Sequence, residues 1–262
     1  MSENIELMMP IKATPYEHQK NAFAFACDKF GIFDEQRKSQ GVALLMEMGT
    51  GKTLVSIAVA GCMYQHGKVK RVLVVAPLSI LGVWEDEFAQ HADYPYSMTI
   101  LKGSTAKKRK QLTKLPSEGL QIVVVNYESA WRLEKELMGY NADLIIADEA
   151  HKLKENRSAQ SKGMHHLGDQ AKYKLLLTGT LITNRELDVF SQYRFLNAKI
   201  FGTSFYSFRN RYFDMCGYGN HTPVFRKSMT DDFLQKLHSV AYRVTKEECL
   251  DLPAITEEVR TV

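Results

Sequence analysis

One stretch of the sequence combines glycines, a lysine and a threonine at the spacing of a phosphate-binding loop. Gly49-Thr50-Gly51-Lys52-Thr53 follows the apolar run Val42–Met46 and precedes a segment compatible with a helix. Glycines let backbone N–H groups approach a phosphate, the lysine can reach its outer oxygens, and the threonine hydroxyl can bind Mg²⁺. We therefore expect nucleotide contacts at Met48, Gly49, Thr50, Gly51, Lys52 and Thr53.

The alternative is a glycine turn in which Gly-Lys-Thr occurs by chance. The full pattern begins with a glycine, and this chain has Met46 at that position. The apolar run before the loop and the helix-compatible segment after it nevertheless supply the strand and the helix that such a loop requires. This context favours phosphate binding.

Two adjacent carboxylates supply the remaining chemistry. Leu144–Ala147, another apolar run, leads directly into Asp148 and Glu149. Asp148 is expected to hold Mg²⁺ together with Thr53, and Glu149 to act as general base on the attacking water. The expected catalytic residues are thus Lys52, Asp148 and Glu149. The alternative, two acids that suit a helix N-terminus, loses weight because the Lys-Thr pair lies upstream.

Short apolar runs alternate with longer segments and indicate how these residues are positioned. Runs rich in Val, Ile and Leu are typical of strands buried on both faces of a parallel sheet. The expected strands are Val42–Met46, Val72–Ala76, Met98–Leu101, Ile122–Val125, Leu144–Ala147 and Leu175–Leu177. The expected helices are Lys52–His66, Ser79–His91, Tyr127–Met138, Ser158–Leu167 and Arg185–Leu196. The alternation predicts an α/β fold, a three-layer P-loop NTPase domain with a mostly parallel sheet and ligands at the carboxyl ends of its strands.

The pattern changes after about Asn197. Apolar residues recur at helical spacing at Phe205, Phe208 and Tyr212, and again at Phe233, Leu237 and Val240. This spacing predicts a helical C-terminal extension rather than further sheet. We expect residues 1–200 to form the nucleotide-binding lobe, residues 201–250 its helical extension, and residues 251–262 an extended linker.

Composition excludes several classes of protein. Apolar residues make up 45% of the 262, which permits a sizeable core and argues against global disorder. Four separated cysteines without Cys-x-x-Cys spacing indicate reduced thiols rather than disulfides or a zinc site. No stretch approaches the ~20 apolar residues of a membrane span, so we expect no membrane contact and a cytoplasmic protein of a prokaryote or a virus-infected host. The net charge of +4 permits an anionic partner.

Further stretches resemble, in order, the motifs of one family. They are Pro15-Tyr16-Glu17-His18-Gln19, Leu73-Val74-Val75-Ala76-Pro77-Leu78-Ser79-Ile80 with Trp84, Val124-Val125-Asn126-Tyr127-Glu128, Asp148-Glu149-Ala150-His151, and Leu176-Leu177-Thr178-Gly179-Thr180. The chain resembles the first RecA-like lobe of superfamily-two helicases, most closely that of Swi/Snf-type DNA translocases. The resemblance covers nearly the whole sequence.

The resemblance implies roles for further residues. Gln19 matches the glutamine whose amide reads the adenine base. The residues implied to couple the nucleotide state to lobe movement are His151, Thr178, Gly179 and Thr180. The residues implied to contact nucleic acid are Pro77, Ser79, Trp84, Asn126 and Tyr127.

The resemblance also implies cofactors and partners. These are ATP and Mg²⁺, double-stranded DNA as the track, and a second RecA-like lobe outside this chain, toward which residues 251–262 would lead. In the family that lobe supplies arginines at the γ-phosphate. Since arginines of this kind contribute about 10³–10⁵ in rate in comparable NTPases, the isolated lobe is expected to be weakly active or inactive.

Two other functions stay open. One is a phosphotransferase or other ATPase that shares only the phosphate loop, against which the Asp-Glu-Ala-His and Thr-Gly-Thr motifs argue. The other is a nucleotide- or DNA-binding switch or scaffold with little hydrolysis of its own. One departure concerns coupling: Leu181-Ile182-Thr183-Asn184 stands where the family usually has Pro-Ile-Gln-Asn.

Overall fold

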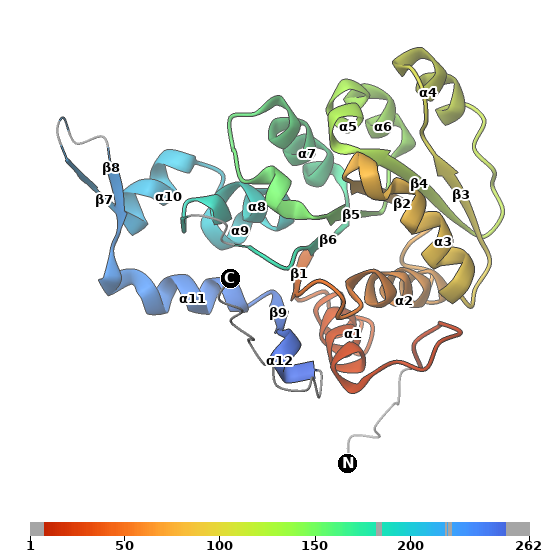
Figure 1. Ribbon diagram of the computed structural model, residues 1–262, viewed down its shortest axis with the longest axis horizontal. Coiled ribbons are helices and arrows are strands. Elements are labelled where there is room, and N and C mark those ends of the chain that lie inside the picture. The colour runs from red at the N-terminus through yellow and green to blue at the C-terminus, as the bar shows by residue number, and fades with distance from the viewer. Residues whose placement is uncertain (1–7, 182–184, 218, 220–221, 250–262) are drawn as a thin grey trace, which may run out of the picture.

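A seven-stranded sheet lies between two layers of helices in the computed structural model, which describes residues 8–181, 185–217, 219 and 222–249 (Figure 1). The strand order is β3-β4-β2-β5-β6-β1-β9, and each neighbouring pair is parallel. The strands are β1 (Gly41–Met46), β2 (Arg71–Ala76), β3 (Tyr96–Ile100), β4 (Leu120–Asn126), β5 (Leu144–Asp148), β6 (Tyr173–Leu177) and β9 (Ala241–Val244). The six predicted strands are confirmed, and with them the predicted α/β fold.

Each central strand faces both helix layers. In β1 all six residues are buried. Val42, Leu44 and Met46 join the core on one side of the sheet, and Ala43 and Leu45 join the core on the other side. Alternate residues of a strand point to opposite faces, so a strand covered on both faces has a continuous apolar sequence.

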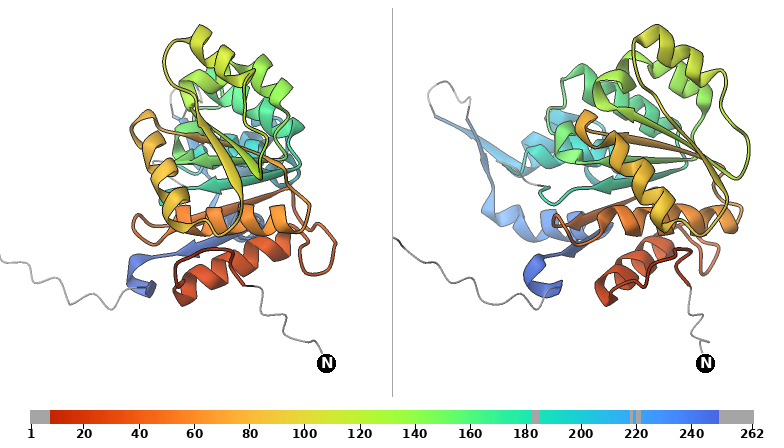
Figure 2. Two further views of the ribbon diagram at one scale, coloured as in Figure 1. Left: turned by 90° about the vertical axis from the view of Figure 1, so that its right-hand side faces the viewer. Right: turned by 45° about the vertical axis from the view of Figure 1, so that its right-hand side comes forward.

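The helices divide between the two faces of the sheet, as the further views show (Figure 2). One layer contains α1 (Glu17–Lys29), α2 (Lys52–Gln65), the short helix η1 (Leu78–Ile80) and α3 (Leu81–His91). The other contains α4 (Thr105–Leu112), α5 (Tyr127–Arg132), α6 (Glu134–Tyr140), η2 (Ala150–Leu153), α7 (Ala159–Gln170) and α8 (Asp188–Leu196). Within the described residues, no helix is long and apolar enough to cross a membrane.

The C-terminal extension is only partly helical. Its elements are α9 (Ala198–Phe201), α10 (Phe205–Tyr212), the antiparallel hairpin of β7 (Phe213–Cys216) and β8 (Thr222–Phe225), η4 (Lys227–Met229), α11 (Thr230–His238), β9 and α12 (Lys246–Cys249). The aromatic residues at helical spacing do lie on helices, and Phe208, Tyr212 and Phe233 pack around Phe201.

The expectation of no further sheet after residue 200 is wrong. The strand β9 pairs with the outer edge of β1, from Ala43 opposite Ala241 to Met46 opposite Val244. This pairing satisfies backbone groups that an exposed edge would leave unpaired. The predicted linker at residues 251–262 lies outside the described residues.

The strand order brings the predicted motifs to one edge. The adjacent strands β5, β6 and β1 end at Asp148, Leu177 and Met46. In parallel strands the carboxyl ends meet at the same edge of the sheet. The phosphate loop, the acidic pair and the Thr-Gly-Thr turn therefore emerge side by side.

Candidate active site

The predicted phosphate loop joins β1 to α2. Met46 is the fully buried last residue of β1, and Lys52 is the first residue of α2. Gly51, at the N-cap of α2, has a φ of 90°, and a Cβ there would lie 2.2 Å from Nε2 of Gln19. The positive φ favours glycine at this position, and a side chain there would also displace the Gln19 amide. Gly49 also has a positive φ, and a Cβ there would meet nothing within 4 Å.

Two side chains of α1 hold the loop from behind. The carbonyl oxygen of Thr50 lies 2.9 Å from Nε2 of His18 and accepts a hydrogen bond from Nε2 of Gln19 at 3.2 Å. Oε1 of Gln19 accepts from the backbone N–H of Tyr16 at 2.9 Å. Each end of the Gln19 amide makes one hydrogen bond within the protein, which leaves one N–H and one lone pair of the oxygen for an adenine. The reading of adenine by Gln19 stays a prediction.

The side chains of the loop differ in exposure. Thr50 is buried, and its hydroxyl donates to the carbonyl of Glu47 at 2.8 Å. Met48 is exposed, whereas Thr53 is half-buried in the first turn of α2. Hydrogen bonds on one side and open space on the other leave the loop held but accessible.

Glu149 meets Lys52 and His151 at the edge of the sheet. Its two carboxylate oxygens lie 3.9 Å from Nζ of Lys52 and 3.2 Å from Nδ1 of His151, which belongs to η2. The backbone of Glu149 is in the left-handed region, with a φ of 49°. For a residue other than glycine this conformation costs about 1–3 kcal/mol and is concentrated at functional sites. The sequence predicted roles for all three residues, and the structure brings them together.

Asp148 lies deeper than Glu149. Its Oδ2 accepts from Nε1 of Trp84 at 3.0 Å, and its Oδ1 accepts from the backbone N–H of Glu149 at 2.9 Å. Its main-chain carbonyl accepts from the hydroxyl of Tyr127 at 2.8 Å. Burial raises the pKa of the Asp148 carboxyl, and the hydrogen bond from Trp84 acts in the opposite direction.

Trp84 is buried in the core, whereas the family motif implied that it contacts nucleic acid. Its side chain is 1% exposed, so its ring is not available to a nucleic acid. The expectation of a nucleic-acid contact at Trp84 is therefore wrong. A buried indole usually finds an acceptor for its N–H, and here the acceptor is the carboxylate of Asp148.

The Thr-Gly-Thr turn packs against the start of the phosphate loop. The hydroxyl of Thr178 bonds to the backbone N–H and carbonyl of Thr180, and the backbone N–H of Thr178 donates to the carbonyl of Leu44. A Cβ on Gly179 would lie 3.4 Å from both Cα of Glu47 and the carbonyl oxygen of Met46. A Cβ at Gly179 would thus be in van der Waals contact with the start of the loop.

The C-terminal extension also supports the loop, which the sequence did not indicate. The backbone N–H of Glu47 donates to the carbonyl of Val244 in β9 at 3.1 Å. The carboxylate of Glu47 accepts from the backbone N–H of Lys246 at 3.2 Å. The strand β9, which the apolar runs did not predict, and Lys246 after it thus hold Glu47, the first residue of the phosphate loop.

A cavity of about 520 Å³ gathers the other predicted nucleic-acid residues. It is lined by Pro77, Leu78, Ser79, Asn126, Tyr127, Glu128, Lys152 and Gln160. Four of the five predicted contacts, all except Trp84, lie here. Lys108, on the basic helix α4, reaches the same region and donates to Ser129 at 2.6 Å and to Asn126 at 3.4 Å.

Comparison with known proteins identifies the family. Residues 18–262 match the model of the SNF2-related domain. The chain belongs to the SNF2-related domain family. It is 32% identical over 219 residues to the rice DNA repair and recombination protein RAD54, covering 78% of this chain and 21% of that protein. It is 28% identical over 185 residues to a mouse DNA excision repair protein, ERCC-6-like, covering 69% of this chain and 14% of that protein.

Solved structures agree with this assignment. The SWI2/SNF2 ATPase core of Sulfolobus solfataricus in complex with dsDNA matches with a TM-score of 0.75 and 25% identity, over 92% of this chain and 47% of that chain. The SWI2/SNF2 ATPase core domain of the same organism matches with a TM-score of 0.71 and 26% identity, over 97% of this chain and 49% of that chain. The SNF2-related domain described here thus spans about half of a SWI2/SNF2 ATPase core and less than a quarter of these two curated relatives. The RecA-like character of the fold is confirmed.

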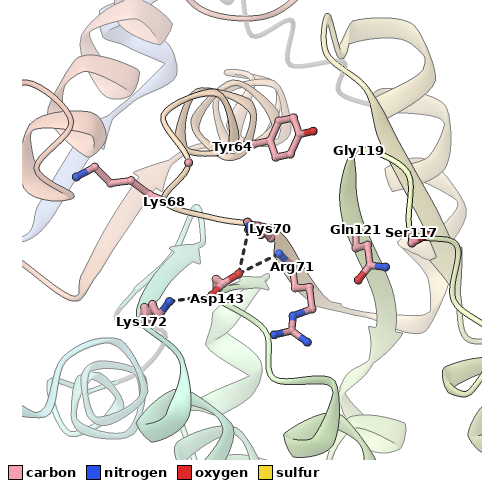
Figure 3. A pocket seen from close by; sticks show the side chains of 10 residues that line it. Tyr64, Lys68, Lys70, Arg71, Ser117, Gly119, Gln121, Asp143 and Lys172 are labelled. Carbon is pink, nitrogen blue, oxygen red and sulfur yellow. Dashed lines mark hydrogen bonds and ion pairs between the residues drawn. The ribbon is translucent and has the colours of Figure 1, made fainter.

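Another cavity of the SNF2-related domain lies at the opposite edge of the sheet. It has a volume of about 620 Å³, and Figure 3 shows its lining at the starts of β2, β4 and β5. One oxygen of Asp143 accepts from the backbone N–H groups of Lys70 and Arg71, and the other lies 3.3 Å from Nζ of Lys172. The Asp143 carboxylate thus links the starts of neighbouring strands, at the edge of the sheet opposite the phosphate loop.

Proposed function

We propose that this SNF2-related domain is the ATP-binding lobe of a DNA-stimulated ATPase that moves along duplex DNA. The observation that carries the proposal is the meeting of Lys52, Glu149 and His151 at the ends of β1 and β5, beside the glycine loop. The family and its ATPase cores support the same chemistry.

ATP and Mg²⁺ fit the residues at this edge. Gly49 faces open space, so a phosphate can approach the loop from that side. Lys52 would bind the outer phosphates, and the hydroxyl of Thr53 with the carboxylate of Asp148 would hold Mg²⁺. Within the described ranges no three His, Cys, Asp or Glu residues form a metal site. A magnesium site with a bound nucleotide needs only one or two carboxylates, because phosphate oxygens supply further ligands.

Glu149 is the residue we propose as general base. Lys52 and His151 flank its carboxylate on two sides, and it is partly exposed. It would orient the attacking water and accept its proton. Mg²⁺, when bound with the nucleotide, neutralises charge on the phosphates. His151 and the turn at Thr178–Thr180, which touches the loop, would report the nucleotide state to the rest of the motor.

Two partners belong to the proposal. Duplex DNA would lie against the 520 Å³ cavity, because Lys152 and the ends of β2 and β4 line it. A second RecA-like lobe would close over the nucleotide and supply arginines, and without it we expect weak hydrolysis. The expected cytoplasmic location stays a prediction; the curated relatives named above are from rice and mouse.

Replacing Lys152 with alanine tests the DNA surface. We expect weaker binding of a duplex oligonucleotide by this chain, with the slope of log affinity against log salt reduced by about 0.9, since one phosphate contact is lost. Fluorescence anisotropy over a salt series measures both quantities. Lys172→Ala, at the opposite edge of the sheet, is the matched control and should keep the wild-type slope. Equal losses in the two variants would contradict a specific surface at the cavity.

A further inference from the structure

Trp84 lies between the cavity proposed to bind DNA and Asp148, the proposed Mg²⁺ ligand. It lies in α3, which begins directly after η1, and η1 carries Leu78 and Ser79 into the lining of the 520 Å³ cavity. At its other end, the indole N–H donates to Oδ2 of Asp148 at 3.0 Å. The side chain itself is buried and reaches neither the cavity nor the phosphate loop.

The hydrogen bond fixes the direction of a buried carboxylate. Asp148 is 5% exposed, so water has little access to its oxygens. Its Oδ1 is held by the backbone N–H of the next residue, Glu149, which moves with it. Trp84 is therefore the donor from another element that sets how the carboxylate is turned. A buried hydrogen bond of this kind has few alternatives, because the interior offers no replacement donor.

A second donor fixes the main chain at the same residue. The hydroxyl of Tyr127 bonds to the carbonyl of Asp148 at 2.8 Å, and Tyr127 begins α5, which also lines the cavity. The helix α5, which lines the cavity, and the helix α3, which follows the cavity-lining η1, thus hold the backbone and the side chain of Asp148. This arrangement leaves the carboxylate little freedom once both contacts are made.

We propose that Trp84 is a positioning residue that aims the Asp148 carboxylate at nucleotide-bound Mg²⁺. The inference rests on the proposed ATP site and adds to it a residue that touches neither nucleotide nor nucleic acid. Partners that orient a metal ligand from behind typically change metal affinity by about 10- to 100-fold when they are removed. Trp84 should accordingly govern how much Mg²⁺ adds to nucleotide affinity.

The test is a titration of this chain with a fluorescent ATP analogue, in EDTA and in saturating Mg²⁺. Trp84→Phe keeps an aromatic ring in the core and removes the donor. We expect its affinity in EDTA to stay within about twofold of the wild type, and its gain in affinity on adding Mg²⁺ to fall about tenfold. An unchanged gain would overturn the inference.

Two further variants separate the hydrogen bond from packing. Phe88→Leu alters a buried ring on the same helix, 6.2 Å from the ring of Trp84, and has no bond to Asp148. Phe88→Leu should lower the melting temperature and keep the full gain in nucleotide affinity on adding Mg²⁺. If Phe88→Leu lost as much of this gain as Trp84→Phe, the effect of Trp84 would be one of core packing and the inference would be overturned. Trp84→His restores an N–H donor and should retain more of the gain than Trp84→Phe, whereas equal losses would overturn the hydrogen-bond role.

Failure of the proposed function would look different. A wild-type chain that binds no nucleotide, with or without Mg²⁺, would overturn the proposed ATP site and this inference together. A wild-type chain that binds nucleotide and gains from Mg²⁺, beside a Trp84→Phe variant that gains equally, would overturn only the role of Trp84.

Discussion

Glu149→Gln in the intact motor is expected to leave ATP binding in place and to lower turnover by about 10²–10⁴-fold, the usual contribution of a general base. Glutamine has nearly the size of glutamate and carries no charge, so it cannot accept the proton of the attacking water. Lys52 and His151 flank the carboxylate at the edge of the sheet, where the water must be oriented.

Single-turnover and steady-state ATPase rates measure the effect, and a nucleotide titration checks binding. Glu118→Gln is a suitable control, because Glu118 is an exposed carboxylate on the segment before β4. It should hydrolyse ATP at the wild-type rate. Retained hydrolysis in Glu149→Gln would mean that another residue is the base.

Lys52→Ala should remove most of the affinity for ATP. Lys52 is the first residue of α2, nearly buried, with its ammonium directed toward Glu149 across the loop. A hydrogen bond to a charged group contributes about 1.5–3 kcal/mol, so we expect a loss of roughly 10- to 150-fold in affinity.

The affinity is measured with the same fluorescent nucleotide, at constant salt. Lys68→Ala removes a lysine from the cavity at the opposite edge of the sheet and should leave the affinity unchanged. If Lys52→Ala bound ATP as tightly as the wild type, Gly49–Thr53 would no longer be a phosphate loop.

The sequence predicted the central strands because burial on both faces leaves a continuous apolar run. Val42–Met46 and Leu144–Ala147 were found in this way, and each extends by one residue in the structure. The sequence does not contain the strand order. Only the structure shows that β5, β6 and β1 are adjacent in the sheet. This adjacency brings motifs separated by about a hundred residues to one edge.

Two features could not be predicted, for different physical reasons. The strand β9 has four residues, of which Tyr242 and Arg243 are not buried, so it has no continuous apolar run. Its assignment depends on the backbone edge of β1, which no local pattern reveals. For Trp84, the resemblance to a family motif implied a contact with nucleic acid, not a buried position. The one available signal was chemical: a buried indole needs an acceptor, and Asp148 was a buried acid in need of donors.

The proposed function depends most directly on the response of ATP turnover to duplex DNA. The measurement is the steady-state ATPase rate of the intact protein that carries this domain, with and without a duplex, over a range of salt concentrations. We predict that duplex DNA raises the rate and that salt weakens the stimulation, since the DNA contacts are largely to phosphates. An equal rate with and without duplex at every salt concentration would contradict a DNA motor and leave an ATPase that acts without nucleic acid.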